Sequence, residues 1–195
     1  NNTLAIADGS GGLASNYTLS GATINVTIIP RTLNVTLSRE YDGTTSVSGV
    51  SLTPTFDSLQ GGETLSLSGT GSVSNANVGS SKAVSLGSIA LAAGSGNPSN
   101  YTLNSATMNI TQRVINLDGI RAYDATTNVL SSDINTFGNI VSGETLTISG
   151  TGSVGSNSVA MNKAVTLGSL SLGNGSGLAS NYTLTGGTHT FDISP

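Results

Sequence analysis

The chain has 195 residues, a net charge of −4 and no cysteine, and only 8% of its residues are charged. The absence of cysteine excludes disulfides and thiolate metal sites, and six scattered basic residues argue against nucleic acid as a partner. No apolar run approaches the ~20 residues that a membrane span needs, so we expect no membrane insertion. Val, Ile and Leu alternate with Thr and Ser, a pattern that favours strands, and we predict an all-β protein.

Residues 1–30 are interpreted as the C-terminal part of a repeat that then occurs twice in full. Residues 13–23 (LASNYTLSGAT) match residues 178–188 (LASNYTLTGGT), which places Pro30 opposite Pro195. We therefore divide the chain into a partial repeat and two full repeats, at residues 1–30, 31–112 and 113–195. Each full repeat has the size of a small independent domain.

The first full repeat predicts six or seven short strands separated by turns. Apolar alternation marks the strands, at residues 33–37, 65–67, 84–91, 101–103 and 108–110. Glycine-rich stretches supply the turns, at residues 61–62, 69–71 and 94–98. This succession favours a small antiparallel β-sandwich-like domain.

The second full repeat copies the first. Residues 62–73 (GETLSLSGTGSV) recur at 143–154 as GETLTISGTGSV. The YDGTT that begins at Tyr41 recurs as YDATT at Tyr123. Chance does not produce such matches, and we expect both full repeats to share one fold.

The junctions between repeats contain no flexible tether. Residues 24–37 (INVTIIPRTLNVTL) lead from the last strand of one repeat into the first strand of the next, with Pro30 between the two ladders. In the second junction, MNITQRVINL, Gln112 takes a similar place. A strand of 8–10 residues spans roughly 30 Å. We therefore expect tandem repeats that form a stiff, elongated, monomeric rod, in which neighbouring repeats are each other's partners.

The order of these motifs resembles the YDG-type repeats of large bacterial exoproteins and the related Mub-B2-like repeats. The resemblance covers nearly the whole chain and assigns a structural signature to seven residues: Tyr41, Asp42, Gly43, Lys82, Tyr123, Asp124 and Lys163. It implies an extracellular, cell-surface adhesin of the filamentous-haemagglutinin-like type that is exported by two-partner secretion. These domains would then be stalk or matrix-binding modules. A β-grasp-like core is the alternative to a sandwich.

The second repeat departs from this pattern by having Ala125 where the first has Gly43. If Gly43 needed a positive φ, alanine there would cost about 1 kcal/mol. Either the turn is therefore type I, which accepts most residues, or the repeats differ locally.

The other YDG residues have structural interpretations. Asp42 and Asp124 are predicted to form turns by accepting hydrogen bonds from nearby backbone N–H groups. Tyr41 and Tyr123 are predicted to lie at a sheet edge with the hydroxyl group in water.

The sequence predicts neither an enzyme nor a cofactor or metal site. The single histidine, His189, lies opposite Ile24 and Met108 in the other repeats, so we interpret it as a residue of a strand face and not as a catalytic base. None of the acidic residues forms the closely spaced cluster that calcium requires.

Each full repeat carries one Lys, one Glu and one Asn at matching positions. The two sets are Lys82, Glu63 and Asn100, and Lys163, Glu144 and Asn181. Such residues form intramolecular isopeptide cross-links in some bacterial adhesin domains, where a buried, deprotonated Lys lies beside a protonated acid. The simpler interpretation is a solvated Lys that protects an edge strand from pairing with neighbours.

Two functions fit the sequence. The leading hypothesis is a stiff spacer that projects a binding tip and supports cell–cell or biofilm adhesion. The alternative is a module that itself binds exopolysaccharide or host glycan through weak, repeated sites. Its candidate contacts are the NYT-motif residues Asn100, Tyr101, Asn181 and Tyr182, with Tyr17 of the partial repeat. Burial decides between the two hypotheses, because a tyrosine in the core cannot stack on a sugar.

Overall fold

The computed structural model describes residues 4–21 and 23–195, so positions 1–3 and 22 of the predicted partial repeat lie outside the described residues. The described chain consists of strands, turns and short 3-10 segments. None of its helical segments is long and apolar enough to cross a membrane. The predicted all-β class is confirmed.

The described residues of the first unit, 4–21 and 23–30, have little regular structure. It contains one 3-10 segment, η1 (Ala14–Asn16), and a bridge between Gly9 and Gly12. Apolar alternation over residues 24–29 predicts a strand, but this stretch is irregular and its side chains are exposed. A strand needs a hydrogen-bonding neighbour, and the described residues of this unit provide none for it.

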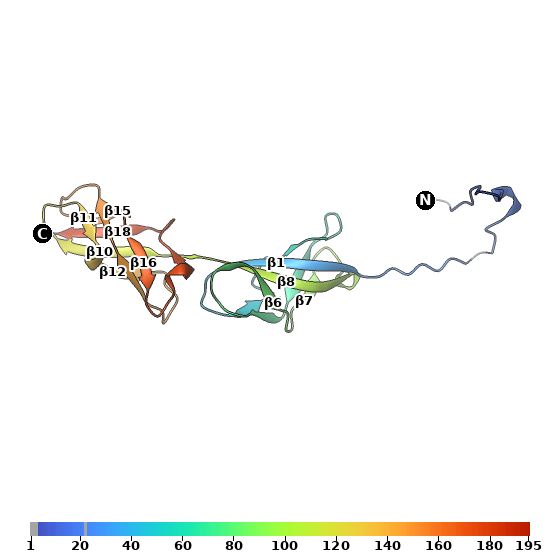
Figure 1. The fold of residues 1–195 in the computed structure, drawn as a ribbon, viewed down its shortest axis with the longest axis horizontal. Helices are drawn as coiled ribbons and strands as arrows, with labels where there is room; N and C mark the ends of the chain where they lie inside the picture. The colour runs from blue at the N-terminus through green and yellow to red at the C-terminus, as the bar shows by residue number, and fades with distance from the viewer. Residues whose placement is uncertain (1–3, 22) are drawn as a thin grey trace. The chain divides into compact units, whose positions relative to one another are not determined.

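The second unit, residues 31–195, contains both full repeats (Figure 1). The second repeat follows the strand succession of the first, except that the first and the last long strand are each divided in two. The strands of the first repeat are β1 (Arg31–Glu40), β2 (Ser46–Ser48), β3 (Thr55–Phe56), β4 (Leu65–Ser68), β5 (Thr70–Val73), β6 (Gly79–Ser85), β7 (Ala90–Ala93) and β8 (Tyr101–Thr111). Those of the second are β9 (Arg113–Val114), β10 (Asn116–Ala122), β11 (Asn128–Leu130), β12 (Ile134–Gly138), β13 (Leu146–Ser149), β14 (Thr151–Val154), β15 (Ala160–Thr166), β16 (Ser171–Asn174), β17 (Tyr182–Thr183) and β18 (His189–Ser194). Three 3-10 segments accompany them, η2 (Pro98–Asn100), η3 (Ser131–Asp133) and η4 (Ala179–Asn181).

Each repeat is built on one curled six-stranded sheet. The strand order is β2-β5-β6-β8-β1-β3 in the first repeat and β11-β14-β15-β18-β10-β12 in the second. A separate antiparallel ribbon, β4–β7 in one repeat and β13–β16 in the other, contributes side chains to the same core. The sequence repeat is therefore also a repeat of structure.

The first and last long strands of each repeat pair in parallel. Strand β1 pairs with β8 from Arg31↔Tyr101 to Glu40↔Thr111, and β10 pairs with β18 in the same sense. The remaining ladders are antiparallel, apart from the short parallel β9–β17 pair, so the sheets are mixed. The expected antiparallel pairing holds for most ladders, but not for the pairs that join the two ends of a repeat. Turn residues indicate pairing between sequence neighbours, whereas strands from opposite ends of a repeat leave no local signal.

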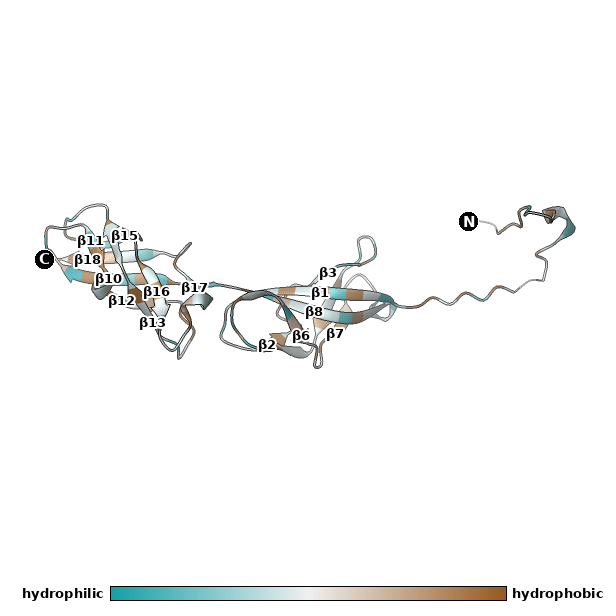
Figure 2. Ribbon diagram, in the orientation of Figure 1, coloured by the Kyte–Doolittle hydropathy of each residue, from teal (hydrophilic) through white to brown (hydrophobic). Residues whose placement is uncertain are grey.

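Strand β1 shows how alternation builds the core. Leu33, Val35 and Leu37 are 0%, 2% and 0% exposed, while Asn34 and Thr36 between them are exposed. Figure 2 shows the same alternation of hydrophobic and hydrophilic residues along the strand. The inward positions that the alternation predicts are confirmed.

The last strand of the second repeat is interrupted where that of the first is continuous. Gly186 adopts a φ of 86°, and the N–H of Gly187 donates a hydrogen bond to the carbonyl of Leu184 at 3.1 Å. This turn separates β17 from β18, because glycine adopts a positive φ at little cost. It leaves β17 free to pair with β9, at the start of the second repeat.

Candidate functional site at the junction between the repeats

The two full repeats meet over a linker of one residue, Gln112, between β8 and β9. The side-chain amide of Gln112 donates hydrogen bonds to the carbonyls of Ser180, at 3.2 Å, and Tyr182, at 3.0 Å. On the first-repeat side, the N–H of Tyr41 donates to the carbonyl of Thr111 at 2.9 Å. The linker is therefore fastened to the second repeat, and the residue before it is fastened to Tyr41.

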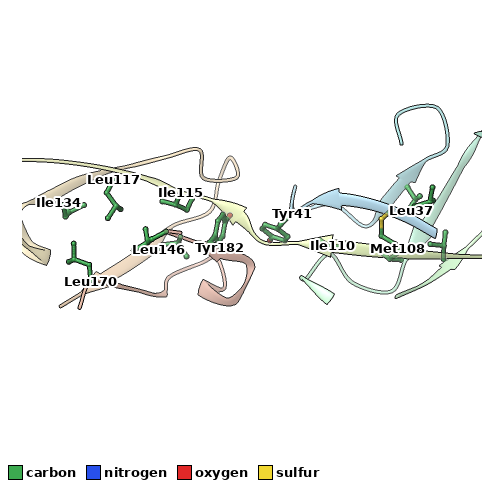
Figure 3. Packing of buried hydrophobic residues seen from close by; sticks show 14 of the residues in the cluster. Leu37, Tyr41, Met108, Ile110, Ile115, Leu117, Ile134, Leu146, Leu170 and Tyr182 are labelled. Atoms are coloured by element: carbon green, nitrogen blue, oxygen red, sulfur yellow. The ribbon is translucent and has the colours of Figure 1, made fainter. Parts of the chain in front are cut away.

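The centre of the junction is a pair of buried tyrosines that share one carboxylate. The rings of Tyr41 and Tyr182 lie edge to face, with centroids 5.4 Å apart and an interplanar angle of 81° (Figure 3). The Tyr41 hydroxyl donates to Oε1 of Glu144 at 2.6 Å, and the Tyr182 hydroxyl donates to Oε2 at 2.6 Å. One glutamate of the second repeat thus binds a tyrosine from each repeat.

Burial and the neighbouring carboxylate both favour the protonated phenols. Burial raises the pKa of Tyr41 above its ordinary value of 10.0, and the hydrogen bond to Glu144 raises it further. The pKa of Tyr182 is raised strongly by the same two causes in the same order. Both tyrosines are therefore held as hydrogen-bond donors to Glu144 at neutral pH.

A buried asparagine forms a second contact across the junction. Asn181 is 1% exposed, and its Oδ1 accepts a hydrogen bond from the N–H of Val78 at 3.0 Å. Its Nδ2 donates to Oδ1 of Asn77 at 3.0 Å. The Asn77-Val78 sequence is thereby joined to the NYT motif of the following repeat.

Arg113 forms a third contact. Its Nη1 donates to the carbonyl of Tyr41 at 3.3 Å, while Nε and Nη2 donate to the carbonyl and side chain of Asn139 at 2.5 and 2.7 Å. Nearby, Glu40 accepts a hydrogen bond from the N–H of Val114 at 2.9 Å. The first residues of the second repeat are therefore oriented by the end of the first.

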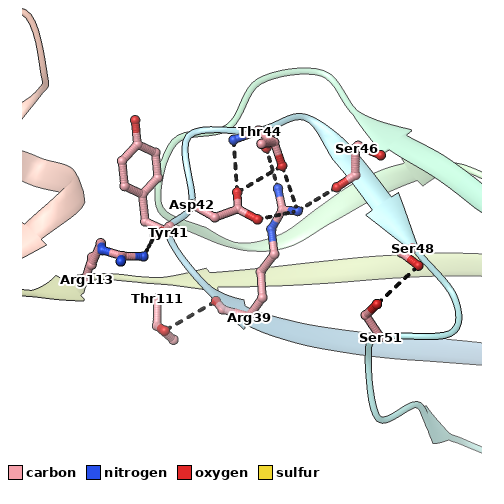
Figure 4. Close-up of polar contacts among 9 residues, drawn as sticks. All are labelled: Arg39, Tyr41, Asp42, Thr44, Ser46, Ser48, Ser51, Thr111 and Arg113. Atoms are coloured by element: carbon pink, nitrogen blue, oxygen red, sulfur yellow. Dashed lines mark hydrogen bonds and ion pairs between the residues drawn. The ribbon is translucent and has the colours of Figure 1, made fainter. Parts of the chain in front are cut away.

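The turn after Tyr41 is held by Asp42 and Arg39 (Figure 4). Oδ1 of Asp42 accepts a hydrogen bond from the N–H of Thr44 at 2.9 Å, as predicted for a turn former. Its Oδ2 lies 3.1 Å from Nη1 of Arg39, which also donates to the carbonyl of Ser46 at 2.5 Å. This network fixes the direction in which Tyr41 leaves the sheet.

The same turn occurs in the second repeat despite the change from glycine to alanine. Gly43 has a φ of 75° and Ala125 has a φ of 65°. Both explanations offered from the sequence, a type I turn or a local difference, were therefore wrong. The second repeat keeps the left-handed conformation, because Asp124 and Arg121 hold the turn in the same way.

Gly43 also lies against the second repeat. A Cβ atom at this position would approach Cγ1 of Val141 to 2.9 Å. Glycine is therefore favoured at Gly43 by its positive φ, and the contact with Val141 leaves no room for a larger residue.

The prediction that Tyr41 lies at a sheet edge with a wet hydroxyl was wrong. Tyr41 is 4% exposed because the second repeat covers it, whereas Tyr123 is 52% exposed. The sequence places both tyrosines in the same motif and cannot say which of them another repeat covers.

The residues considered for an isopeptide cross-link are not brought together. Lys82 donates to Oδ1 of Asn75 at 2.7 Å, whereas Glu63 accepts a hydrogen bond from Tyr101. Lys163 donates to Oγ of Ser156 at 3.0 Å. The role of edge-strand protection was also wrong, since β6 and β15, which carry the two lysines, are paired on both sides. The lysines fasten the loop that precedes their own strand.

The NYT tyrosines do not offer a stacking surface. Tyr101 is 7% exposed and Tyr182 is 2% exposed, and Asn181 is buried with them. Asn100 is exposed, and so is Tyr17 in the first unit. Beside the junction lies a groove of about 640 Å³, which Asp42 and Arg113 help to line, and no aromatic ring lines it. Their burial therefore argues against the stacking of a sugar ring on Tyr101 or Tyr182.

His189 is a hydrogen-bonded residue of the core. Its Nδ1 accepts from the N–H of Leu117 at 3.1 Å, and Nε2 lies 2.9 Å from the carbonyl of Leu184. Nδ1 thus helps to hold β18 beside β10, and Nε2 holds the turn that precedes β18. Among the described residues, no group of three or more acidic or histidine side chains is placed to hold a metal ion.

Comparison with known families identifies the family of the chain. The YDG domain family matches the chain twice, at residues 25–108 and 111–190, so the chain belongs to the YDG domain family. No curated protein and no solved structure matches the chain. The residues of the YDG motif are those that build the turn and the junction.

Proposed function

We propose that the chain is a stalk segment of a large, secreted bacterial cell-surface adhesin of the filamentous-haemagglutinin-like, two-partner-secretion type. In this proposal its repeats form a stiff spacer that projects a binding tip and supports cell–cell or biofilm adhesion. The role is mechanical and extracellular, and it involves no catalysis. Membership of the YDG family and the construction of the junction support it.

The observation that carries the proposal is the buried tyrosine pair on Glu144. Bending at the junction would separate Tyr41 from Tyr182 and break the hydrogen bond from Tyr41 to the carboxylate. A hydrogen bond to a charged group contributes about 1.5–3 kcal/mol, and an aromatic pair adds about 0.5–1.5 kcal/mol. A linker of one residue gives the chain little freedom to avoid this cost.

The spread of distances between the two repeats tests the proposal. The chain has no cysteine, so Ser85→Cys and Thr166→Cys, at matching exposed positions, provide two unique sites for spin labels. We expect one narrow distance distribution for this doubly labelled chain. Adding Tyr41→Ala should broaden it, while adding Tyr123→Ala, which removes an exposed ring, should leave it narrow. A broad distribution before either change would overturn the spacer.

Titration with bacterial exopolysaccharides and host glycans tests the alternative. The burial of Tyr101 and Tyr182 favours no binding by this chain. Binding that increases with the number of repeats would instead support an adhesive module.

A further inference from the structure

We propose that the outer end of the second repeat is a docking surface for a further YDG repeat. This trailing face consists of Tyr123, Ala125 and Val159. Its partner is the receiving face that the first repeat presents, made of Gln60, Glu63, Asn100 and Tyr101. The inference rests on the proposed spacer only in assuming that YDG repeats follow one another in series.

The trailing face is exposed where its counterpart in the first repeat is covered. Tyr123 is 52% exposed, against 4% for Tyr41. Val159 is 49% exposed, whereas Val78 is partly buried against the core. The second repeat thus leaves uncovered the two apolar side chains that the first repeat uses at the junction.

The backbone at Tyr123 already makes the hydrogen bond and the turn that it makes at Tyr41. Its N–H donates to the carbonyl of Ser194 at 2.9 Å, as that of Tyr41 donates to Thr111. The following turn repeats the ion pair, with Asp124 2.9 Å from Arg121. Docking would therefore need no rearrangement of the backbone that carries the ring.

The receiving face of the first repeat has the matching acceptor. Tyr101 donates to Oε2 of Glu63, as Tyr182 donates to Oε2 of Glu144. The other oxygen of Glu144 accepts from Tyr41, whereas Oε1 of Glu63 receives no hydrogen bond from the described residues. If Tyr123 donated a hydrogen bond to Oε1 of Glu63 in a docked repeat, Glu63 would bind two tyrosines, as Glu144 does.

The residue that faces the YDG turn determines which repeats the trailing face can bind. In the observed junction Gly43 faces Val141, and a Cβ atom on Gly43 would come within 2.9 Å of Cγ1 of Val141. The trailing face carries a Cβ atom there, on Ala125, so a valine at position 141 would clash with it. The receiving face of the first repeat has Gln60 at the equivalent position, which is not branched at Cβ and whose Oε1 accepts a hydrogen bond from Arg31 at 3.0 Å. The trailing face should therefore bind a repeat with glutamine at this position, as in the first repeat, more tightly than a repeat with valine there, as in the second.

The test extends the full chain by a second copy of residues 31–112 after Pro195, so that Pro195 precedes Arg31 as Pro30 does. We measure nitration of Tyr123 by tetranitromethane, with peptide mass mapping, in the original and extended chains. Docking should slow nitration roughly tenfold, as the exposed fraction of the ring falls from 52% toward the 4% of Tyr41. Equal nitration rates in the two chains would overturn the proposal.

Two substitutions test the preference. Gln60→Val in the appended copy should restore most of the nitration of Tyr123, and adding Ala125→Gly should protect the ring again. Glu63→Gln in the appended copy should also weaken protection, since it removes the carboxylate acceptor. If Gln60→Val has no effect, the assigned contact between Ala125 and Gln60 is wrong.

Circular dichroism reports whether the appended copy folds. If it does not, an appended copy of residues 113–195 carrying Val141→Gln and Tyr123→Phe replaces it, so that only the original Tyr123 is measured, and the same two outcomes apply. Spin labels introduced through Ser85→Cys and Thr166→Cys in the original part of the extended chain record the distance across the first junction. An exposed Tyr123 beside a narrow first-junction distribution would overturn the docking surface alone, whereas a broad first-junction distribution would overturn the spacer.

Discussion

At the residue scale, the turn of the YDG motif shows how a local strain is retained. Ala125 adopts a φ of 65°, which glycine tolerates and alanine disfavours by roughly 1–2 kcal/mol. The strain persists because Asp124 accepts a hydrogen bond from the N–H of Thr126 at 2.9 Å and pairs with Arg121. The motif is thus defined by the turn that its carboxylate and arginine hold, and the glycine is replaceable where no side chain like that of Val141 lies against it.

Ala125→Gly should stabilise the second repeat by about 0.5–1 kcal/mol, because relief of the left-handed strain exceeds the entropy that glycine adds to the unfolded chain. Urea unfolding measures the change. The matched control is Gly43→Ala, which should destabilise the chain by more than this amount, since its Cβ atom would also contact Val141. Equal and opposite effects at the two positions would contradict the role of Val141.

The buried tyrosines predict a loss of stability at alkaline pH. The pKa values of Tyr41, Tyr182 and Tyr101 are raised in the folded chain, for Tyr101 chiefly by its hydrogen bond to Glu63. The folded chain therefore keeps protons that the unfolded chain releases near its ordinary pKa of about 10. The stabilisation is complete below that pH and is lost as the pH rises through the folded values.

Urea unfolding at about pH 8 and about pH 11 measures this loss. Glu144→Gln removes one cause of the raised pKa of Tyr41 and Tyr182, so the alkaline loss should be smaller in that variant. An unchanged loss in Glu144→Gln would show that burial alone is responsible.

At the element scale, the strands predicted at residues 33–37 and 65–67 lie within β1 and β4. The turn predicted at 69–71 was wrong, since β5 begins at Thr70, and the run predicted at 84–91 covers the end of β6, a turn and the start of β7. The partners of the strands do not follow from alternation. The inward positions on β1 and β4 could be predicted because alternate side chains of a strand face opposite sides. The parallel pairing of β1 with β8 could not, since nothing local connects the two strands. The prediction of a strand over residues 24–29 was wrong for the same reason. Alternation shows which side chains would share a face of a strand, but a strand forms only beside a hydrogen-bonding neighbour.

Leu65→Ala should destabilise the first repeat by about 2–5 kcal/mol, because Leu65 is 7% exposed in the core with Leu33 and Tyr101. Thermal or urea unfolding measures the change. Ser66→Ala, on the exposed face of the same strand, is the control and should have little effect. An unchanged unfolding curve for Leu65→Ala would contradict its position in the core.

At the scale of the whole second unit, the core continues from one repeat into the other. Buried residues from both repeats belong to one apolar cluster, with Tyr41 and Tyr182 at the crossing. The sequence contained the central residues of this junction, in the YDG motif, the Asn77-Val78 pair, the Gly-Glu-Thr-Leu block that carries Glu144, and the NYT motif. It could not show that these motifs from different repeats meet, because a motif does not reveal which neighbour covers it.

The shared core predicts that the two repeats unfold together. Tyr41→Ala should separate one calorimetric transition into two, since stability in tandem repeats is the sum of intrinsic and interface contributions. A double-mutant cycle of Tyr41→Phe with Glu144→Gln should give a coupling energy of about 1.5–3 kcal/mol. Two transitions in the unaltered chain would contradict a coupled junction.

The parallel pairing of β1 with β8 has a consequence for a chain under tension. The chain enters the first repeat at Arg31, the start of β1, and leaves it at Thr111, the end of β8, and the two strands are paired along nearly their whole length. A pull on these two ends slides β1 past β8, so the load is shared by the hydrogen bonds of the whole ladder at once. An antiparallel terminal pair would place both pulled ends at the same edge and open one bond at a time. Each repeat is therefore built to resist pulling along the chain, which is the direction in which a tether between a cell and a surface is loaded.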